Sequence, residues 1–208
     1  MVDPAILRAW LSGRSIARGL PAPVDDGGGF RIDTNSEAEV RRWIFPQPCD
    51  GLAALAQSIT QPRHVLKLCD EASVLRSIVP DRWQIQPPGY FMRGHGAPPP
   101  HPLPDGYRIA VMQTGPIAKV RLLSEDGVLA ASGVSAETAD AFVYDRIVTE
   151  PAHRRKGLGR IVMATLGAAR RNHATPELLV ATEDGKALYA ALGWDVISDY
   201  ATASISPC

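Results

Sequence analysis

Four apolar segments that follow one another with short turns between them constrain this chain more than any other feature. They are Tyr107–Met112, Ile117–Leu123, Val128–Val134 and Phe142–Val148. The sequences QTGP (113–116) and SEDG (124–127) separate the first three, and connections this short and rich in turn residues join antiparallel strands. Residues 107–148 are therefore predicted to form an antiparallel meander.

Helices and strands alternate after the meander. A helix from Gly157 to about Arg171 has one apolar face, and a second helix, Asp184–Leu192, ends at Gly193. A short apolar strand, Leu178–Ala181, lies between these helices, and Trp194–Ile197 begins another strand. A meander followed by strand, helix and strand predicts an α+β fold with a mixed, mostly antiparallel central sheet and flanking helices.

The segment GHGAPPPHPLPDG, residues 94–106, divides the chain. Its prolines remove backbone hydrogen-bond donors and favour extended structure, and its glycines loosen the chain. It is predicted to be a linker between an N-terminal α/β region, residues 1–93, and a C-terminal domain, residues 107–208.

The N-terminal region mixes helical and strand patterns without a repeat. Helices are predicted at Ala5–Leu11, Gly51–Ile59 and Glu71–Ile78, and strands at Phe30–Asp33 and His64–Leu68. A further helix is predicted to begin at Asn35 or Ser36 and to carry Val40, Trp43 and Ile44 on one face. This region contains no chemical motif of its own.

Charge and composition exclude several classes of function. Lys plus Arg and Asp plus Glu number 22 each, so no overall field attracts nucleic acid or an anionic membrane. No apolar run approaches the roughly 20 residues that cross a bilayer, and no signal peptide is evident, so the cytoplasm is the expected location. The three cysteines, Cys49, Cys69 and Cys208, are an odd number without metal-ligand spacing, which argues against disulfides and a metal site.

A basic, glycine-containing turn lies in the segment DRIVTEPAHRRKGLGRIVM, residues 145–163. Gly157 and Gly159 open a predicted helix, where unpaired amides and the helix dipole form an anion site. Four basic side chains surround the turn, namely Arg154, Arg155, Lys156 and Arg160. The pattern predicts a bound phosphate group, and its plainer alternative is a tight turn with a solvated run of charge.

Residues 154–159, RRKGLG, resemble the defining turn of the GNAT N-acetyltransferases, which is Gln or Arg, two residues, Gly, one residue, then Gly or Ala. The segment EDGKALYAALGW, residues 183–194, is similar to the second helix of that family, with its Leu-Tyr pair followed by Leu-Gly-aromatic. The resemblance covers residues 105–200, the C-terminal half of the chain. This chain lacks the one or two helices that usually separate the first two strands in the family, because only residues 113–116 lie between them.

The resemblance implies acetyl-coenzyme A as co-substrate, held in a V-shaped opening between the fourth and fifth strands. Its pantetheine arm would lie along Ile147, Val148 and Thr149, whose backbone amides would polarise the thioester carbonyl. Its pyrophosphate would bind the turn formed by Arg154, Arg155, Lys156, Gly157, Leu158, Gly159 and Arg160. Asp184 stands where the family often has an Asn that contacts pantetheine, and Tyr189 matches the tyrosine that protonates the departing thiolate.

The general base is less well defined by the sequence. Asp145 is favoured because strand alternation places it on the same face as Ile147 and Thr149. Glu137, Glu150 and Glu183 remain alternatives. Residues 1–93 are expected to replace the missing helices, either by folding over the open side or as the decayed half of a tandem acyltransferase.

The sequence thus predicts an enzyme that moves acetyl from acetyl-coenzyme A to a primary amine of a small molecule, amino acid or peptide. Two alternatives are a non-catalytic coenzyme A-binding sensor or interaction module, and a nucleotide-binding protein. The nucleotide-binding alternative is weaker, because the glycine turn lacks the GKS or GKT ending of a P-loop and the full dinucleotide fingerprint. Neither nucleic acid nor membrane is an expected partner, and a homodimer through sheet edges remains open.

Overall fold

The computed structural model describes residues 1–96 and 98–206. The first part contains α1 (Pro4–Arg18), β1 (Val24–Asp26), β2 (Gly29–Asp33), β3 (Arg41–Phe45), α2 (Asp50–Ser58), β4 (His64–Leu68), α3 (Ala72–Ile78), β5 (Gln84–Ile85) and β6 (Gly89–Gly94). The second contains β7 (Tyr107–Thr114), β8 (Ile117–Ser124), β9 (Leu129–Glu137), β10 (Phe142–Thr149), the 3₁₀ helix η1 (Pro151–His153), α4 (Leu158–Gly167), β11 (Glu177–Thr182), α5 (Glu183–Ala190) and β12 (Asp195–Ser204).

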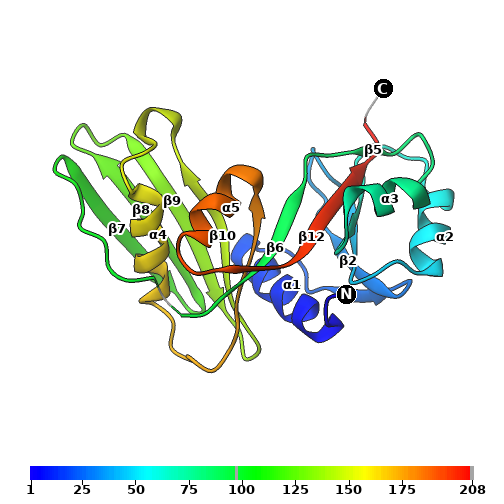
Figure 1. Ribbon diagram of the computed structural model, residues 1–208, viewed down its shortest axis with the longest axis horizontal. Helices are drawn as coiled ribbons and strands as arrows, with labels where there is room; N and C mark the ends of the chain where they lie inside the picture. The colour runs from blue at the N-terminus through cyan, green and yellow to red at the C-terminus, as the bar shows by residue number, and fades with distance from the viewer. Residues whose placement is uncertain (97, 207–208) are drawn as a thin grey trace.

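The strands form one mixed sheet in the order β1-β2-β3-β4-β12-β6-β11-β10-β9-β8-β7, with β5 paired to β12. The predicted meander is present, because β7, β8, β9 and β10 pair antiparallel in sequence order. Parallel pairs occur twice, between β3 and β4 and between β10 and β11. The α+β fold with a mixed sheet and flanking helices is therefore confirmed (Figure 1). No helix in the described parts of the chain is long and apolar enough to cross a membrane.

The two halves exchange strands at the centre of the sheet. β6 comes from the first half but lies between β11 and β12, and β12 continues past β6 to pair with β4. Apart from the two-residue β5 and the 3₁₀ helix η1, each half runs strand, helix, strand, helix and then the exchanged strand, as β3-α2-β4-α3-β6 and β10-α4-β11-α5-β12. Apart from Gly94, which ends β6, the described residues of the Pro-rich segment 94–106 form no helix or strand, yet the sheet is continuous across the two regions that it joins.

The helix predicted from Asn35 or Ser36 to Ile44 is wrong. The backbone amides of Thr34 and Asn35 both donate to Val40 O, which closes a loop, and the chain then enters β3. The spacing of Val40, Trp43 and Ile44 suggested a helical face, but the residues after Arg41 are all buried. Trp43 packs on one side of the sheet and Ile44 on the other, as in a parallel strand that is covered on both faces.

Helices cover both faces of the second half. α4 and α5 pack on one face, in a core that includes Val120, Phe142, Tyr144, Leu166 and Tyr189. α1 packs on the opposite face, where its residues Leu7, Trp10 and Leu11 contact Val143 and Leu178. The first helix, predicted to end at Leu11, continues to Arg18 and ends at Gly19 in the left-handed conformation. The N-terminal region therefore covers the face that the short β7–β8 turn leaves without helices.

Gly13 allows α1 to approach β10 closely. A Cβ atom at Gly13 would lie 2.5 Å from Val143 Cγ2, which is shorter than any normal contact. Gly13→Ala should therefore lower the free energy of unfolding by about 1–3 kcal/mol, although alanine favours helix formation by about 1 kcal/mol. Urea denaturation measures this change. Ser12→Ala, on the same helix, serves as the control and should be neutral or slightly stabilising, and equal stability of Gly13→Ala would contradict the close approach.

Candidate active site

β10 and β11 pair only where they begin. Phe142 pairs with Glu177 and Val143 with Leu178, and no pairing continues beyond them. β10 nevertheless runs on to Thr149, while β11 is paired along its whole length with β6 on its other side. From Tyr144 onwards the edge of β10 is therefore not paired with β11, and this opening between two parallel strands lies where the family resemblance implied a V-shaped one.

A β-bulge interrupts β10 inside this opening. Asp145 pairs with Val134 and Val148 with Ser132, so Arg146 and Ile147 together oppose one residue of β9. Arg146 has φ 53°, a left-handed conformation that is uncommon outside glycine. A bulge leaves backbone groups outside the ladder, so this part of β10 can direct amide donors into the opening. Gly133 makes the packing possible, since a Cβ there would lie 2.6 Å from Ile147 Cδ1.

The chain then forms η1 and the glycine turn before α4. Gly157 is the N-cap of α4 with φ 75°, and Arg155 also has a positive φ of 62°. The amides of Arg160 and Ile161 donate to Gly157 O, whereas those of Leu158 and Gly159 precede the first intrahelical bond. No side chain caps this N-terminus. The arrangement is suited to an anion, because free amides and the positive end of the helix dipole coincide.

The basic side chains of the turn are mostly exposed. Arg154 and Arg155 are open to solvent, and Arg160 donates only a long bond of 3.3 Å to Ala191 O. Lys156 Nζ donates to Tyr107 Oη at 2.9 Å, and Tyr107 Oη lies 2.9 Å from His153 Nδ1. His101, from the Pro-rich segment, lies against Gly157, with Nε2 2.7 Å from the position that a Cβ would take. No sequence motif marks His101, which stands among prolines.

Tyr189 lies on α5 with 6% of its surface exposed and packs beside Trp194. Its hydroxyl makes no hydrogen bond with any described residue. The hydroxyl oxygen is not fully buried, so solvent reaches it. Burial raises the pKa of Tyr189 well above its usual value, and the charge of Asp145 adds to the effect. The phenol is therefore protonated and lies within the electrostatic reach of Asp145. Asp184, in the first turn of α5, is exposed.

Asp145 is held by arginines. Arg18 Nε and Nη2 donate to its two oxygens at 2.6 and 2.8 Å, and Arg14 Nε lies 3.7 Å from Oδ1. Arg146 Nε lies 3.6 Å from Oδ2. Both oxygens of the carboxylate face arginines rather than an incoming amine, so the geometry argues against Asp145 as the general base.

The other carboxylates considered for the base lie in different surroundings. Glu137 accepts bonds from the amides of Arg171 and Asn172 and pairs with the Arg171 side chain. Burial opposes ionisation there, but these bonds outweigh it and lower the pKa of Glu137. Glu183 accepts a hydrogen bond from Tyr90 Oη. Glu150 lies directly before η1, next to the end of β10.

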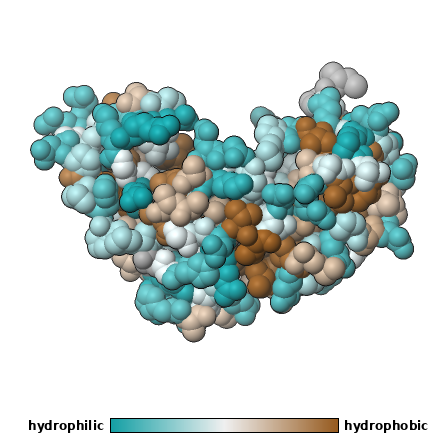
Figure 2. All heavy atoms as spheres, viewed as in Figure 1, coloured by the Kyte–Doolittle hydropathy of each residue, from teal (hydrophilic) through white to brown (hydrophobic). Residues whose placement is uncertain are grey.

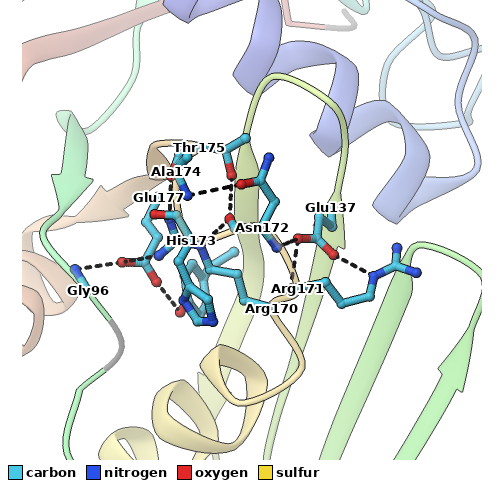
Figure 3. Close-up of polar contacts among 10 residues, drawn as sticks. Gly96, Glu137, Arg170, Arg171, Asn172, His173, Ala174, Thr175 and Glu177 are labelled. Atoms are coloured by element: carbon cyan, nitrogen blue, oxygen red, sulfur yellow. Dashed lines mark hydrogen bonds and ion pairs between the residues drawn. The ribbon is translucent and has the colours of Figure 1, made fainter.

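Glu177 fixes the point where β10 and β11 part (Figure 3). It is 1% exposed, accepts from Tyr144 Oη at 2.8 Å and from the Gly96 amide at 2.8 Å, and lies 3.2 Å from Arg170 Nη1. Arg170 also donates to carbonyl oxygens of Asn172, His173 and Thr175. This buried network ties the loop after α4, the start of β11 and β10 together. Sequence reasoning missed it because a lone Glu in an apolar strand carries no motif.

A second polar group lies on the α1 side of the sheet. It comprises Arg14 and Arg18 of α1, Arg42 of β3, Lys67 of β4, Asp145 of β10 and Tyr200 of β12. Lys67 Nζ donates to Thr202 Oγ1 at 2.9 Å and lies 5.2 Å from the centre of the Tyr200 ring. Burial, followed by the charges of Arg14 and Arg42, lowers the pKa of Lys67 from 10.5 to about 7. Burial likewise lowers the pKa of Arg14 to about 10.

Several solved structures with similar folds are described as GNAT proteins or acetyltransferases. A GCN5-related N-acetyltransferase from Kribbella flavida is 15% identical with a TM-score of 0.68, over 100% of this chain and 97% of that chain. A putative GNAT-family acetyltransferase from Novosphingobium aromaticivorans is 16% identical with a TM-score of 0.60, over the whole of both chains. A tandem GNAT protein from the clavulanic acid biosynthesis pathway is 15% identical with a TM-score of 0.50, over 75% of this chain and 68% of that chain.

The chain therefore has the GNAT fold. No protein-family model matches the sequence, and a search of curated proteins finds no match. The resemblance was expected to cover only residues 105–200, but the structural similarity extends over the entire chain. That limit was too narrow because residues 1–93 carry no GNAT motif in sequence, while their backbone follows the same fold.

The Glu177 network should make a large contribution to stability. Glu177→Ala would leave Arg170 buried and without its carboxylate, which typically costs about 3–5 kcal/mol. Chemical denaturation should show this loss in the free energy of unfolding. Glu125→Ala, which removes an exposed carboxylate from a turn, should change it by less than about 0.5 kcal/mol. A Glu177→Ala protein as stable as the Glu125→Ala control would show that the network contributes little.

Lys67 should make stability depend on pH. The unfolded chain keeps this proton up to about pH 10, whereas the folded chain releases it near pH 7, so the free energy of unfolding should rise between these values. Lys67→Met removes the cost of a buried charge and should stabilise the protein at pH 6 by about 1.4 kcal/mol per unit of pKa shift. The gain should shrink towards pH 10. The exposed Lys119→Met is the control, and urea denaturation at both pH values distinguishes them.

Proposed function

We propose that the protein is an N-acyltransferase that moves an acetyl group from acetyl-coenzyme A to a primary amine. The observation that carries the proposal is the opening between β10 and β11, which contains a β-bulge and ends at a basic helix N-terminus. An extended chain with an acyl thioester at one end and a diphosphate further along fits such a site. The strand edge accepts the chain, and the helix accepts the diphosphate.

The residues present fit this co-substrate. The amides of Leu158 and Gly159, with Gly157 and the basic side chains of Arg154, Arg155, Lys156 and Arg160, would hold the pyrophosphate. The backbone of Ile147, Val148 and Thr149 would hold the pantetheine arm, and Asp184 is exposed near the same opening. Bound there, the co-substrate supplies an activated acetyl group, and every other contribution comes from the chain itself.

The chemistry needs charge stabilisation and two proton movements. As the amine nitrogen forms a bond to the carbonyl carbon, negative charge develops on the carbonyl oxygen, and amides at the β10 bulge would stabilise it. The carbon–sulfur bond breaks, and Tyr189 would give its proton to the departing thiolate. The amine loses one proton to water. With Asp145 bound to Arg18, Glu150 is the remaining carboxylate beside the end of β10 that could assist this step.

A coenzyme A-binding sensor without turnover is the main alternative. Such a protein would need the turn at α4 but not a protonated phenol in the opening. The position of Tyr189 favours an enzyme, because its hydroxyl makes no hydrogen bond with any described residue and is therefore free to give a proton to a thiolate. The first half offers no second site of this kind, since β3 and β4 stay paired over all five residues, from Arg41–His64 to Phe45–Leu68.

Tyr189→Phe should reduce kcat for acetyl transfer by about 100-fold, because the proton donor is lost while ring packing is kept. Thiol release with a panel of amines measures kcat, and calorimetry with acetyl-coenzyme A should give an unchanged Kd. Tyr90→Phe, which removes another partly exposed phenol, is the control and should retain activity. Unaltered turnover in Tyr189→Phe would remove its assigned role. Failure of the folded wild-type protein to bind acetyl-coenzyme A or coenzyme A would overturn the proposal as a whole.

A further inference from the structure

The polar group on the α1 side of the sheet brings side chains from both halves together. Alternation along the strands places Arg42 and Lys67 on the same face as Tyr200 and Thr202, away from the core that contains Trp43, Leu66 and Ala201. Arg14 and Arg18 lie one turn apart on α1, which covers this face of the sheet. Both side chains reach Asp145 of β10. The cluster is thus assembled only when both halves are in place.

Positive charge exceeds negative charge in this cluster. Arg18 is matched by Asp145, and Arg42 by Glu39. Arg14 makes no hydrogen bond to any described residue, and its Nε reaches only the carboxylate that Arg18 already holds. Lys67 has one bond, to the neutral hydroxyl of Thr202. Neither Arg14 nor Lys67 has a carboxylate of its own in this partly buried region, and a positive charge on either side chain is unfavourable there unless an anion completes it.

The cluster adjoins the proposed reaction centre. Asp145, which Arg14 and Arg18 approach, directly precedes the β10 bulge, and its charge acts on Tyr189. The Arg14 side chain is 13% exposed, so it is desolvated enough to bind an anion strongly and still open enough to meet one. A small molecule held by Arg14 would therefore have its other end near the bulge.

We propose that the acceptor amine carries an anionic group, a carboxylate, which binds Arg14 and Lys67 at the junction of the two halves. This inference rests on the proposed acetyl transfer and names the substrate class of that site. One unmatched guanidinium and one ammonium of low basicity fit a single negative charge. Charge-assisted hydrogen bonds from both would fix the anion, and the amine would extend towards the bulge. A phosphate offers the same anionic oxygens and is the other possible source of this charge.

Binding can be tested without turnover. Thermal unfolding of the full chain is followed with each of the twenty amino acids, β-alanine and 4-aminobutyrate, with the matching primary amides, and with phosphoethanolamine. A ligand of the folded state raises Tm. At least one amino carboxylate should raise Tm while its amide does not, and Arg14→Gln and Lys67→Met should lose the shift. Arg8→Gln, an exposed arginine of α1 paired with Asp25, should keep it.

Two outcomes of this measurement overturn the inference. If no amino carboxylate raises Tm more than its amide, the anion site does not exist. If only phosphoethanolamine raises Tm, the site takes a phosphate and the carboxylate assignment is wrong. Lys67→Met is expected to be stable, so its loss of the shift cannot be attributed to unfolding.

Thiol release from acetyl-coenzyme A separates this inference from the proposed function. An amino carboxylate should have a kcat/KM about 10- to 100-fold above that of its amide, and Arg14→Gln should remove the difference through KM. If Arg14 had a purely structural role, Arg14→Gln would lower kcat/KM equally for the amino carboxylate and for its amide. Equal rates for acids and amides would leave acetyl transfer standing and overturn the anion site. A Tm shift with an amino carboxylate but no thiol release with any amine would overturn the transfer and keep the site.

Discussion

The end of pairing between β10 and β11 is the constraint on which the rest of the structure depends. Parallel strands that remain paired offer no edge to a ligand, whereas these two part after Val143 and Leu178 and leave one edge of β10 free. The buried carboxylate of Glu177 sits at this point and binds Tyr144 of β10, Arg170 of the preceding loop and the amide of Gly96. Both strands are thereby held at the apex while their far ends are free to diverge. The bulge in β10 and the amides of α4 could contact a ligand only because this opening exists.

The exchange of β6 and β12 explains how residues 1–93 contribute to one functional unit. β6 of the first half lies beside β11, which diverges from β10. β12 of the second half lies beside β4, which stays parallel to β3. Neither half therefore completes its part of the sheet alone. The molecule is hollowed between the halves, and hydrophilic side chains line much of the rim on the face shown in Figure 2. A decayed tandem acyltransferase would have such a repeated order of strands and helices, and this origin of residues 1–93 stays a prediction. The first half keeps the backbone order but has no basic glycine turn between β3 and α2, and its parallel strands stay paired.

Much of the second half could be predicted because its signals are local. The turns around Gly115 and Gly127 specify hairpins, both glycines having positive φ, and Gly157 marks the start of α4. The first half was harder. Val40, Trp43 and Ile44 have helical spacing, yet pairing with β4 makes a strand of this segment, and no local pattern reveals a partner more than twenty residues away. The partners of Asp145 were missed for a similar reason. Arg14 and Arg18 lie four residues apart in line with Trp10, a pattern that becomes visible only if the first helix is extended to its cap at Gly19.

The arginines of α1 also change what Asp145 can do. As an isolated strand carboxylate it would be a reasonable proton acceptor, which is how the sequence presents it. Bound by Arg18 and approached by Arg14, it instead positions cationic side chains beside the opening and contributes a fixed negative charge near Tyr189. The same residue thus links three elements that are far apart in the chain, namely α1, the β10 bulge and α5. A helix from the N-terminal region therefore does more than cover an exposed sheet face, because its arginines determine the charge around Asp145, where we propose that the acceptor binds.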